Sequence, residues 1–151
     1  MLTEISSRAL TVRATSSLTT CAPFGMVSEG WSLKVPGSFG ERWTSDEWWG
    51  GEAGRSITLA ATITEADGQP MAPEAFLARV AGDLGDDAIS HGHGSVTGRA
   101  RLTTDASSGV QVGVVEGYSA VSGSGAAIRI VFHDPSDWEW AFGMWRSLTH
   151  D

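Results

Sequence analysis

The sequence predicts one α+β domain in which two helices flank a central antiparallel sheet of about six strands. Three observations support this fold class. Several segments alternate apolar and polar residues with the period of two that a strand imposes, and two segments repeat apolar residues at the spacing of a helix. The connections between neighbouring strands are also shorter than the crossovers of a dozen or more residues that parallel pairs need. We therefore expect antiparallel pairing.

The C-terminal segment is the most informative part of the chain. Residues 126–133 alternate as a buried strand, and apolar residues at intervals of three and four then predict a helix over 136–149. Asp134 and Pro135 form a start signal, because the carboxylate accepts from free backbone amides and proline fits the first helical position. The expected inner stripe of this helix consists of Trp138, Ala141, Phe142, Trp145 and Leu148.

The other strands are predicted from the same alternation. The clearest spans Arg55 to Thr64, with Ile57 and Leu59 on its core face. Glu116 shares a strand face with Val114, so it lies at the sheet margin or has a partner there. Further strands are expected at 31–35, 41–49, 95–104 and 110–121, with Ser122–Gly125 as a tight hairpin turn.

A second, shorter helix is predicted over 73–81, because Pro73 provides a start signal and Gly82 a stop signal. The acidic, glycine-rich segment 82–94 is expected to be a mobile loop. Residues 1–23 are predicted to form an N-terminal arm or an edge strand, and residues 24–151 to form the single α+β domain.

Composition excludes several classes of protein. The chain has 151 residues and 41% apolar content, which supports one hydrophobic core. Eighteen acidic residues against ten basic ones give a net charge of −8, which disfavours nucleic acid as a partner. The single cysteine, Cys21, excludes an internal disulfide and a cysteine-rich zinc site. We find no export signal and no apolar run long enough to span a membrane, so we expect a cytoplasmic protein.

Two phrases give the chain a family resemblance. The segment GWSLKVP at 30–36 and the aromatic ending WEWAFGMWRSL at 138–148 resemble the PsbP-like superfamily over roughly residues 24–150. That superfamily includes the photosystem II extrinsic subunit, a Ran-binding nuclear-transport factor, bacterial lipoproteins and DcrB-like proteins, among them chaperones for secreted effectors. The resemblance implies an antiparallel sheet flanked by helices and a non-enzymatic role in binding or assembly.

Only one pattern in the sequence has the character of a metal site. His91 and His93 alternate in the glycine-rich segment, and His133 with Asp134, or Asp86 with Asp87, would complete a ligand set. A small metal-dependent enzyme or metal-binding protein is therefore the alternative function. The other interpretation is that a flexible loop tolerates histidine. No nucleophile elbow, phosphate loop or HExxH helix is present, so we predict no catalytic residue and no cofactor.

The tryptophans favour a binding role. The chain has seven of them, and their predicted parities direct Trp31, Trp43, Trp138 and Trp145 inward. The residues with weaker claims to burial are Trp48, Trp49, Trp140 and Met144. If helices cover both faces of the sheet, these residues belong to the core; otherwise they form a partner-binding surface. We predict a protein partner or a homodimer, recognised by an aromatic and acidic, chaperone-like surface that suits a basic or amphipathic segment.

Overall fold

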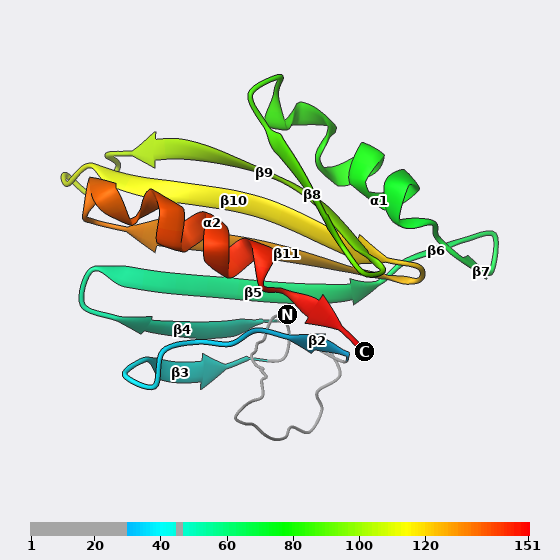
Figure 1. The fold of residues 1–151 in the computed structure, drawn as a ribbon, viewed down its shortest axis with the longest axis horizontal. Helices are drawn as coiled ribbons and strands as arrows, with labels where there is room; N and C mark the ends of the chain where they lie inside the picture. The colour runs from blue at the N-terminus through cyan, green and yellow to red at the C-terminus, as the bar shows by residue number, and fades with distance from the viewer. Residues whose placement is uncertain (1–29, 45–46) are drawn as a thin grey trace.

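The computed structural model describes residues 30–44 and 47–151. It contains a seven-stranded antiparallel sheet in the order β3-β4-β5-β11-β10-β9-β8, together with two α-helices (Figure 1). The α+β class and the antiparallel pairing are as predicted, and the sheet has one strand more than expected. The predicted arm over 1–23, Cys21 and the first residues of the predicted domain lie outside the described residues.

The bounds of the elements are as follows. The main sheet consists of β3 (Gly40–Trp43), β4 (Trp48–Glu52), β5 (Arg55–Ile63), β8 (Ile89–His93), β9 (Val96–Asp105), β10 (Val112–Val121) and β11 (Ser124–Phe132). The helices are α1 (Pro73–Val80), η2 (Gly82–Leu84), η3 (Pro135–Asp137) and α2 (Trp138–Arg146). Two short ladders pair β2 (Trp31–Ser32) with β12 (Thr149–His150), and β6 (Glu65–Ala66) with β7 (Gln69–Pro70).

The main core lies between the sheet and α2. Ile57 of β5 pairs with Ile130 of β11, and both are fully buried. Trp145 packs directly on the sheet at Gly117, where an added Cβ would lie 2.7 Å from the indole Cδ1. Glycine at this position therefore lets the helix approach the strand closely. This contact fixes α2 over β10 and β11.

Helix α1 packs on the opposite face of the sheet. Its Phe76 ring covers Gly125 of β11, where an added Cβ would lie 2.4 Å from the ring. Gly117, beneath Trp145, pairs with Ile128 of the same β11 strand. Gly125 and Ile128 are three residues apart, so they face opposite sides of the sheet. Each face therefore carries one helix, and α1 covers only the end of its face near Ala120.

The predicted loop over 82–94 is wrong in its second half. Residues Ile89–His93 form β8, the edge strand of the main sheet, and pair with β9. His93 pairs with Val96 across the two-residue turn Gly94–Ser95, and Gly94 has a φ of 60°. A glycine in the left-handed region suits such a hairpin turn. The strand could not be predicted from apolar–polar alternation, because Ile89 is its one apolar residue besides glycine.

The predicted strand over 41–49 is in fact a hairpin. The chain reverses between β3 and β4, and the Thr44 Oγ1 accepts a hydrogen bond of 3.1 Å from the backbone N–H of Glu47. The reversal pairs Trp43 with Trp48, so these two side chains share a face and Trp49 lies on the other. A parity counted through the turn groups Trp43 with Trp49, whereas the structure groups Trp43 with Trp48.

The C-terminal segment has the predicted order of strand, turn and helix, with a strand that begins two residues earlier and a helix that is shorter. Asp134 caps the turn as expected, because its carboxylate accepts from the backbone N–H of Ser136 at 3.0 Å. The cap begins η3, and α2 ends at Arg146 instead of residue 149. The last residues instead form β12, which pairs with β2 beside the helix.

Candidate partner-binding surface

The seven tryptophans divide into buried and accessible groups. Trp31, Trp48 and Trp145 are buried, Trp49 and Trp140 are half-buried, and Trp43 and Trp138 are 44% and 46% exposed. The sequence prediction placed Trp43 and Trp138 inward, and both assignments are wrong. For Trp48 the sequence left the core and a partner-binding surface open, and the core is the correct alternative. Met144 is also buried, so it does not belong to a surface either.

Trp48 is a core residue because the β3–β4 hairpin directs its side chain to the sheet face that carries the main core. It pairs with Leu59 of β5, which is fully buried, and its own exposure is 0%. Its ring extends over Gly50, and its Nε1 donates a hydrogen bond of 3.1 Å to the Glu41 Oε1. The indole therefore combines apolar burial with a satisfied N–H group. A contact with a partner is not compatible with this position.

Trp49 lies on the opposite face of the sheet, beside cationic side chains. The Arg42 guanidinium stacks over its ring at 4.5 Å from the centroid. Strand pairing continues this row through Thr58 of β5 to Arg129 and Glu116. The row ends with Arg101 of β9, which donates to Glu116. Trp49 therefore belongs to a polar, largely self-paired surface.

Glu116 has ion-pair partners on its sheet face, which is one of the two alternatives that the sequence left open. Its Oε1 accepts from Arg101 at 3.1 Å, and its Oε2 accepts from Arg129 at 3.3 Å. Arg129 also approaches Asp105 at 3.5 Å. These side chains are about one-third to one-half exposed, so the network neutralises the open sheet face without stabilising it strongly.

Trp140 lies on the flank of α2 that faces β4 and β5. The Arg55 guanidinium stacks over its ring at 4.4 Å and makes two hydrogen bonds to Asp137, at 2.8 and 3.0 Å. These bonds raise the pKa of Arg55 above its ordinary value. Phe39 contacts the same indole edge to face, with the ring centroids 6.3 Å apart. We call Phe39, Arg55, Asp137 and Trp140 the sealed flank.

The other flank of α2 faces β9 and is more open. Trp138 is 46% exposed and contacts Phe142 edge to face, while the Arg146 guanidinium lies 5.7 Å above the Phe142 ring. Leu102 of β9 is 41% exposed and pairs with Val115, which is buried on the face that α2 covers. We call Leu102, Trp138, Phe142 and Arg146 the open flank.

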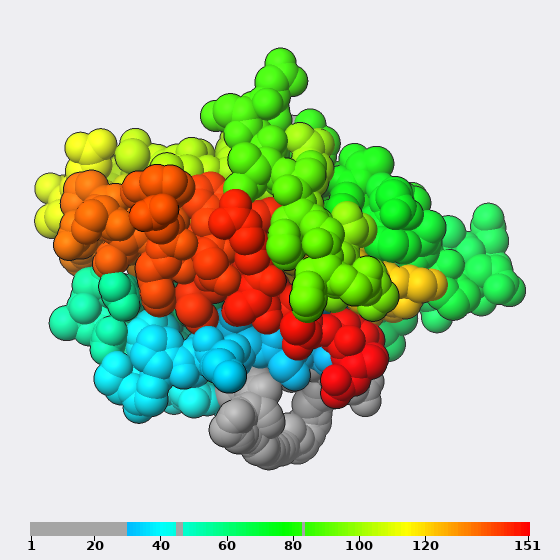
Figure 2. All heavy atoms as spheres, in the orientation of Figure 1, coloured from blue at the N-terminus to red at the C-terminus, as the bar shows by residue number. Residues whose placement is uncertain are grey.

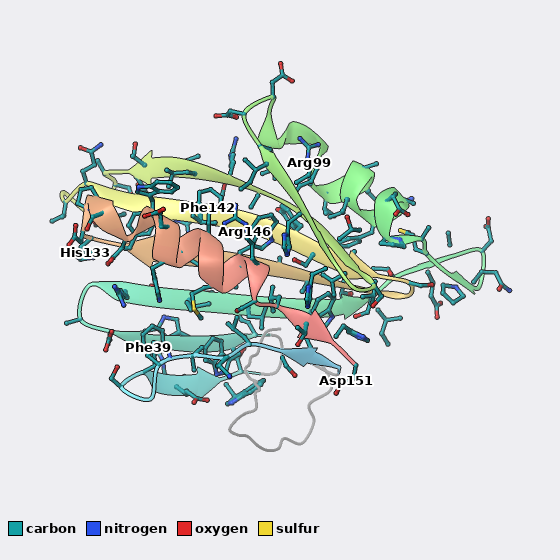
Figure 3. All side chains as sticks on the ribbon, viewed as in Figure 1. Phe39, Arg99, His133, Phe142, Arg146 and Asp151 are labelled. Carbon is teal, nitrogen blue, oxygen red and sulfur yellow. The ribbon has the colours of Figure 1, made fainter. Side chains whose placement is uncertain are left out.

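The figures show the two flanks on either side of the helix. Phe142 and Arg146 lie on the side of α2 towards β9 and β10, and Phe39 lies on the opposite side (Figure 3). The space-filling view shows the segment that contains β2 and β3, in blue and cyan, packed along one side of α2, with β8, in green, on the other side (Figure 2). A helical repeat of 3.6 residues separates Trp138 from Trp140 by about 200° around the axis. The two indoles therefore serve different surfaces.

The histidines do not form the predicted metal site. Among the described residues, no group of three or more His, Cys, Asp or Glu side chains lies close enough together to hold a metal ion. His91 and His93 are neighbours, with ring centroids 6.5 Å apart. His133 follows β11 at the other end of the sheet, and Asp134 is engaged as the cap of η3, where the N–H of Ser136 lowers its pKa. The four residues therefore do not act together within one chain.

Comparisons with known proteins add no assignment. No family model matches the sequence, and no curated protein is significantly similar to it. Within the described ranges, no helix has both the length and the apolar character needed to cross a membrane. The open flank, which the sequence reasoning missed, was hidden because Trp138 and Leu102 both follow patterns that are typical of core residues.

Proposed function

We propose that this protein is a non-enzymatic binding module that recognises an amphipathic segment of another protein through the open flank of α2. The observation that carries the proposal is the exposure of Trp138 and Leu102 beside the main core, at 46% and 41%. A tryptophan and a leucine with this exposure on one surface are unfavourable in water, and clusters of such residues commonly mark interfaces. Trp is also enriched among the residues that contribute most to binding energy.

The position of the open flank favours a helical or extended ligand. Leu102 lies on the same sheet face as the buried residues beneath α2, in the row of Val115. Phe142 is buried beside Trp138 and provides an apolar base for it. A ligand that packs along α2 would therefore extend the existing core and would cover both exposed side chains.

Charge indicates the chemistry of the ligand. Three carboxylates, those of Asp134, Asp137 and Glu139, lie at the start of α2 and in the turn before it, against the one guanidinium of Arg146 near the helix end. Asp137 is paired with Arg55, and the side chains of Asp134 and Glu139 are exposed. With a net charge of −8 for the whole chain, these groups favour a ligand that flanks its apolar residues with Lys or Arg.

A PsbP-like relationship is part of the proposal. It is supported by the antiparallel sheet that carries one helix on each face and by the aromatic sequence of α2. The resemblance implies binding or assembly roles, including a chaperone-like role towards client segments. Such a role requires an accessible apolar surface beside a stable core, which is the arrangement of the open flank.

The proposal is tested with a labelled amphipathic helical peptide of leucine and lysine, whose binding is followed by fluorescence anisotropy. A peptide of the same composition in scrambled order controls for charge alone. We expect Trp138→Ala and Leu102→Ser each to weaken binding, by about tenfold for the tryptophan. Trp49→Ala is the matched control, because this half-buried tryptophan lies on the other sheet face, and it should bind the peptide as the wild type does.

Two results would overturn the proposal. One is unchanged peptide binding by folded Trp138→Ala and Leu102→Ser proteins. The other is equal binding of the ordered and the scrambled peptide, which would show attraction by charge alone. Self-association is measured separately, by sedimentation in the presence of a chelator. If the wild type is a dimer under these conditions and Trp138→Ala is a monomer, the ligand of the open flank is a second copy of the protein.

A further inference from the structure

The edge strand β8 carries two histidines whose geometry is not explained by the open flank. His91 and His93 are two residues apart, so they point to the same face of the strand. Their rings are almost parallel, with an interplanar angle of 11° and a centroid separation of 6.5 Å. Side chains two apart on a strand can present two imidazoles to one metal ion, and imidazole is a favoured ligand of Zn²⁺.

The nitrogen atoms of His91 are not equivalent. Its Nε2 is buried without a hydrogen-bond partner, and its ring lies 5.6 Å from the ring of Trp145. The Nδ1 is therefore the nitrogen that remains for a ligand. Packing against Trp145 also fixes the position of this ring, and His93 is exposed beside it. The pair is a half-site with one fixed and one accessible imidazole.

Within the described part of the chain, nothing completes this half-site. No third His, Cys, Asp or Glu lies close enough to the pair to form a metal-binding group. A structural zinc site normally has four ligands. The described residues of one chain therefore supply only two of the four ligands, and the position of β8 in the sheet indicates a source for the other two.

Strand β8 is the last strand of the main sheet, and its one strand partner among the described elements is β9. It runs across the front of the molecule between α2 and α1 (Figure 1). In a hairpin closed by a two-residue turn, the pair next to the turn is hydrogen-bonded, here His93 with Val96. By alternation, Gly92 directs its backbone N–H and C=O to the outer edge. Gly92 has no side chain to hinder another strand there, and nothing lies within 4 Å of where its Cβ would be.

We infer that two copies of this protein join their β8 edges around Gly92 and bind one Zn²⁺ ion with His91 and His93 of both copies. Antiparallel pairing centred on Gly92 places each His91 opposite the His93 of the second copy. All four imidazoles then lie on one face of a continuous sheet. Directly opposite residues have Cβ atoms about 4.5–5.5 Å apart, which suits ligands of one tetrahedral ion.

This pairing also explains the edge itself. An exposed edge strand invites uncontrolled pairing, and proteins commonly protect such edges. A metal site that requires both histidine pairs permits association in one register, because a shift by two residues would place Ile89 opposite His93. Each chain carries a charge of −8, so the two copies repel each other and the ion supplies positive charge at the contact.

The experiment measures mass in solution by sedimentation, at physiological ionic strength, on protein without a histidine tag. The probe is Zn²⁺ alone, added to the chelator-treated protein. We expect a monomer in chelator and a dimer that contains one Zn²⁺ per two chains. Co²⁺ in place of Zn²⁺ should give the visible absorption of a tetrahedral ion. A monomer that binds zinc one to one, or a dimer that persists in chelator, would overturn the inference.

Three variants separate the site from the fold. His93→Ala should abolish the dimer and weaken zinc binding by more than about tenfold, and it should fold because His93 is exposed. Gly92→Pro retains both histidines but removes the outward N–H, so it should also remain a monomer. His133→Ala, at the other end of the sheet, should dimerise normally. If folded His93→Ala or Gly92→Pro protein dimerised with zinc as the wild type does, that result would contradict the inference.

The inference is independent of the proposed function. Trp138→Ala should dimerise with zinc as the wild type does, whereas His93→Ala should bind the amphipathic peptide unchanged. If zinc fails to dimerise the protein, the peptide result still stands. If peptide binding fails, the zinc result still stands.

Discussion

Trp138 and Trp140 are separated by one residue on α2, yet their surroundings differ completely. Trp140 is stacked under Arg55, contacted by Phe39 and held near the ion pair to Asp137. Trp138 contacts Phe142 and is 46% exposed. The comparison shows that the helix is fixed by its sealed flank and by its inner residues. The open flank is therefore available for another role.

The largest expected effect concerns the inner face of α2, which both flanks share. Trp145→Ala removes a buried indole that packs on Gly117, and it should lower the free energy of unfolding by about 3–5 kcal/mol. Trp138→Ala should change this free energy by less than about 1 kcal/mol, because the indole is half exposed. Urea unfolding of the two variants measures the difference. Similar losses for both would remove the distinction between the inner face and the open flank.

A smaller effect is expected from the sealed flank. Asp137→Asn removes the charge from a bidentate, partly buried ion pair with Arg55, whose side chains are 31% and 17% exposed for Arg55 and Asp137. The expected loss of stability is about 1–2 kcal/mol, after a discount for solvent screening. Arg129→Gln, on the exposed network of the other sheet face, should cost less than about 1 kcal/mol. The reverse order would show that the sealed flank does not hold the helix.

His150, in β12, makes the stability of the protein depend on pH. His150 contacts Trp31 edge to face, and its burial lowers the pKa of the imidazole below 6.5. Between that lowered pKa and 6.5 the unfolded state binds more protons, so stability rises with pH in this window and is lost as the pH falls. Urea midpoints from pH 7.5 to 5.5 should therefore decrease, and His150→Gln should decrease less. An equal decrease in both proteins would exclude His150 as the cause.

The smallest effect concerns the outer face of α2, which neither flank covers. Gly143 is exposed, and nothing lies within 4 Å of the position of an added Cβ. Gly143→Ala should raise stability by about 0.5–1 kcal/mol, because alanine loses less conformational freedom in a helix. Thermal unfolding measures the gain, and a loss would indicate a contact on this face. Peptide binding should not change.

The sequence was sufficient for the elements whose signals are local. Pro73 at the start of α1 and Asp134 before η3 lie where their capping chemistry predicts. A hairpin turn was predicted over Ser122–Gly125, and the structure has a shorter turn there, because Ser124 already pairs with Val121. Strand β8 was missed because two histidines, a serine and a glycine show no apolar alternation. Its presence depends on pairing with β9, a contact that alternation does not encode.

The tryptophan assignments failed for two physical reasons. The parity of Trp43 and Trp48 was counted through a turn, and a reversal of the chain resets which side chains share a face. Trp138 lies on the apolar stripe of its helix, but it occupies the first residue of α2, to one side of the buried residues. A helical pattern gives direction around the axis and does not reveal how far the covering sheet extends.

The most direct test of the open flank follows the seven indole N–H signals of the ¹⁵N-tryptophan-labelled protein by NMR during titration with the amphipathic peptide. Single substitutions assign each signal. We predict that the Trp138 signal shifts progressively and saturates, while the signals of buried Trp48 and Trp145 and of Trp49 on the other sheet face stay in place. Saturable movement of the Trp49 signal with an unmoved Trp138 signal would contradict the account.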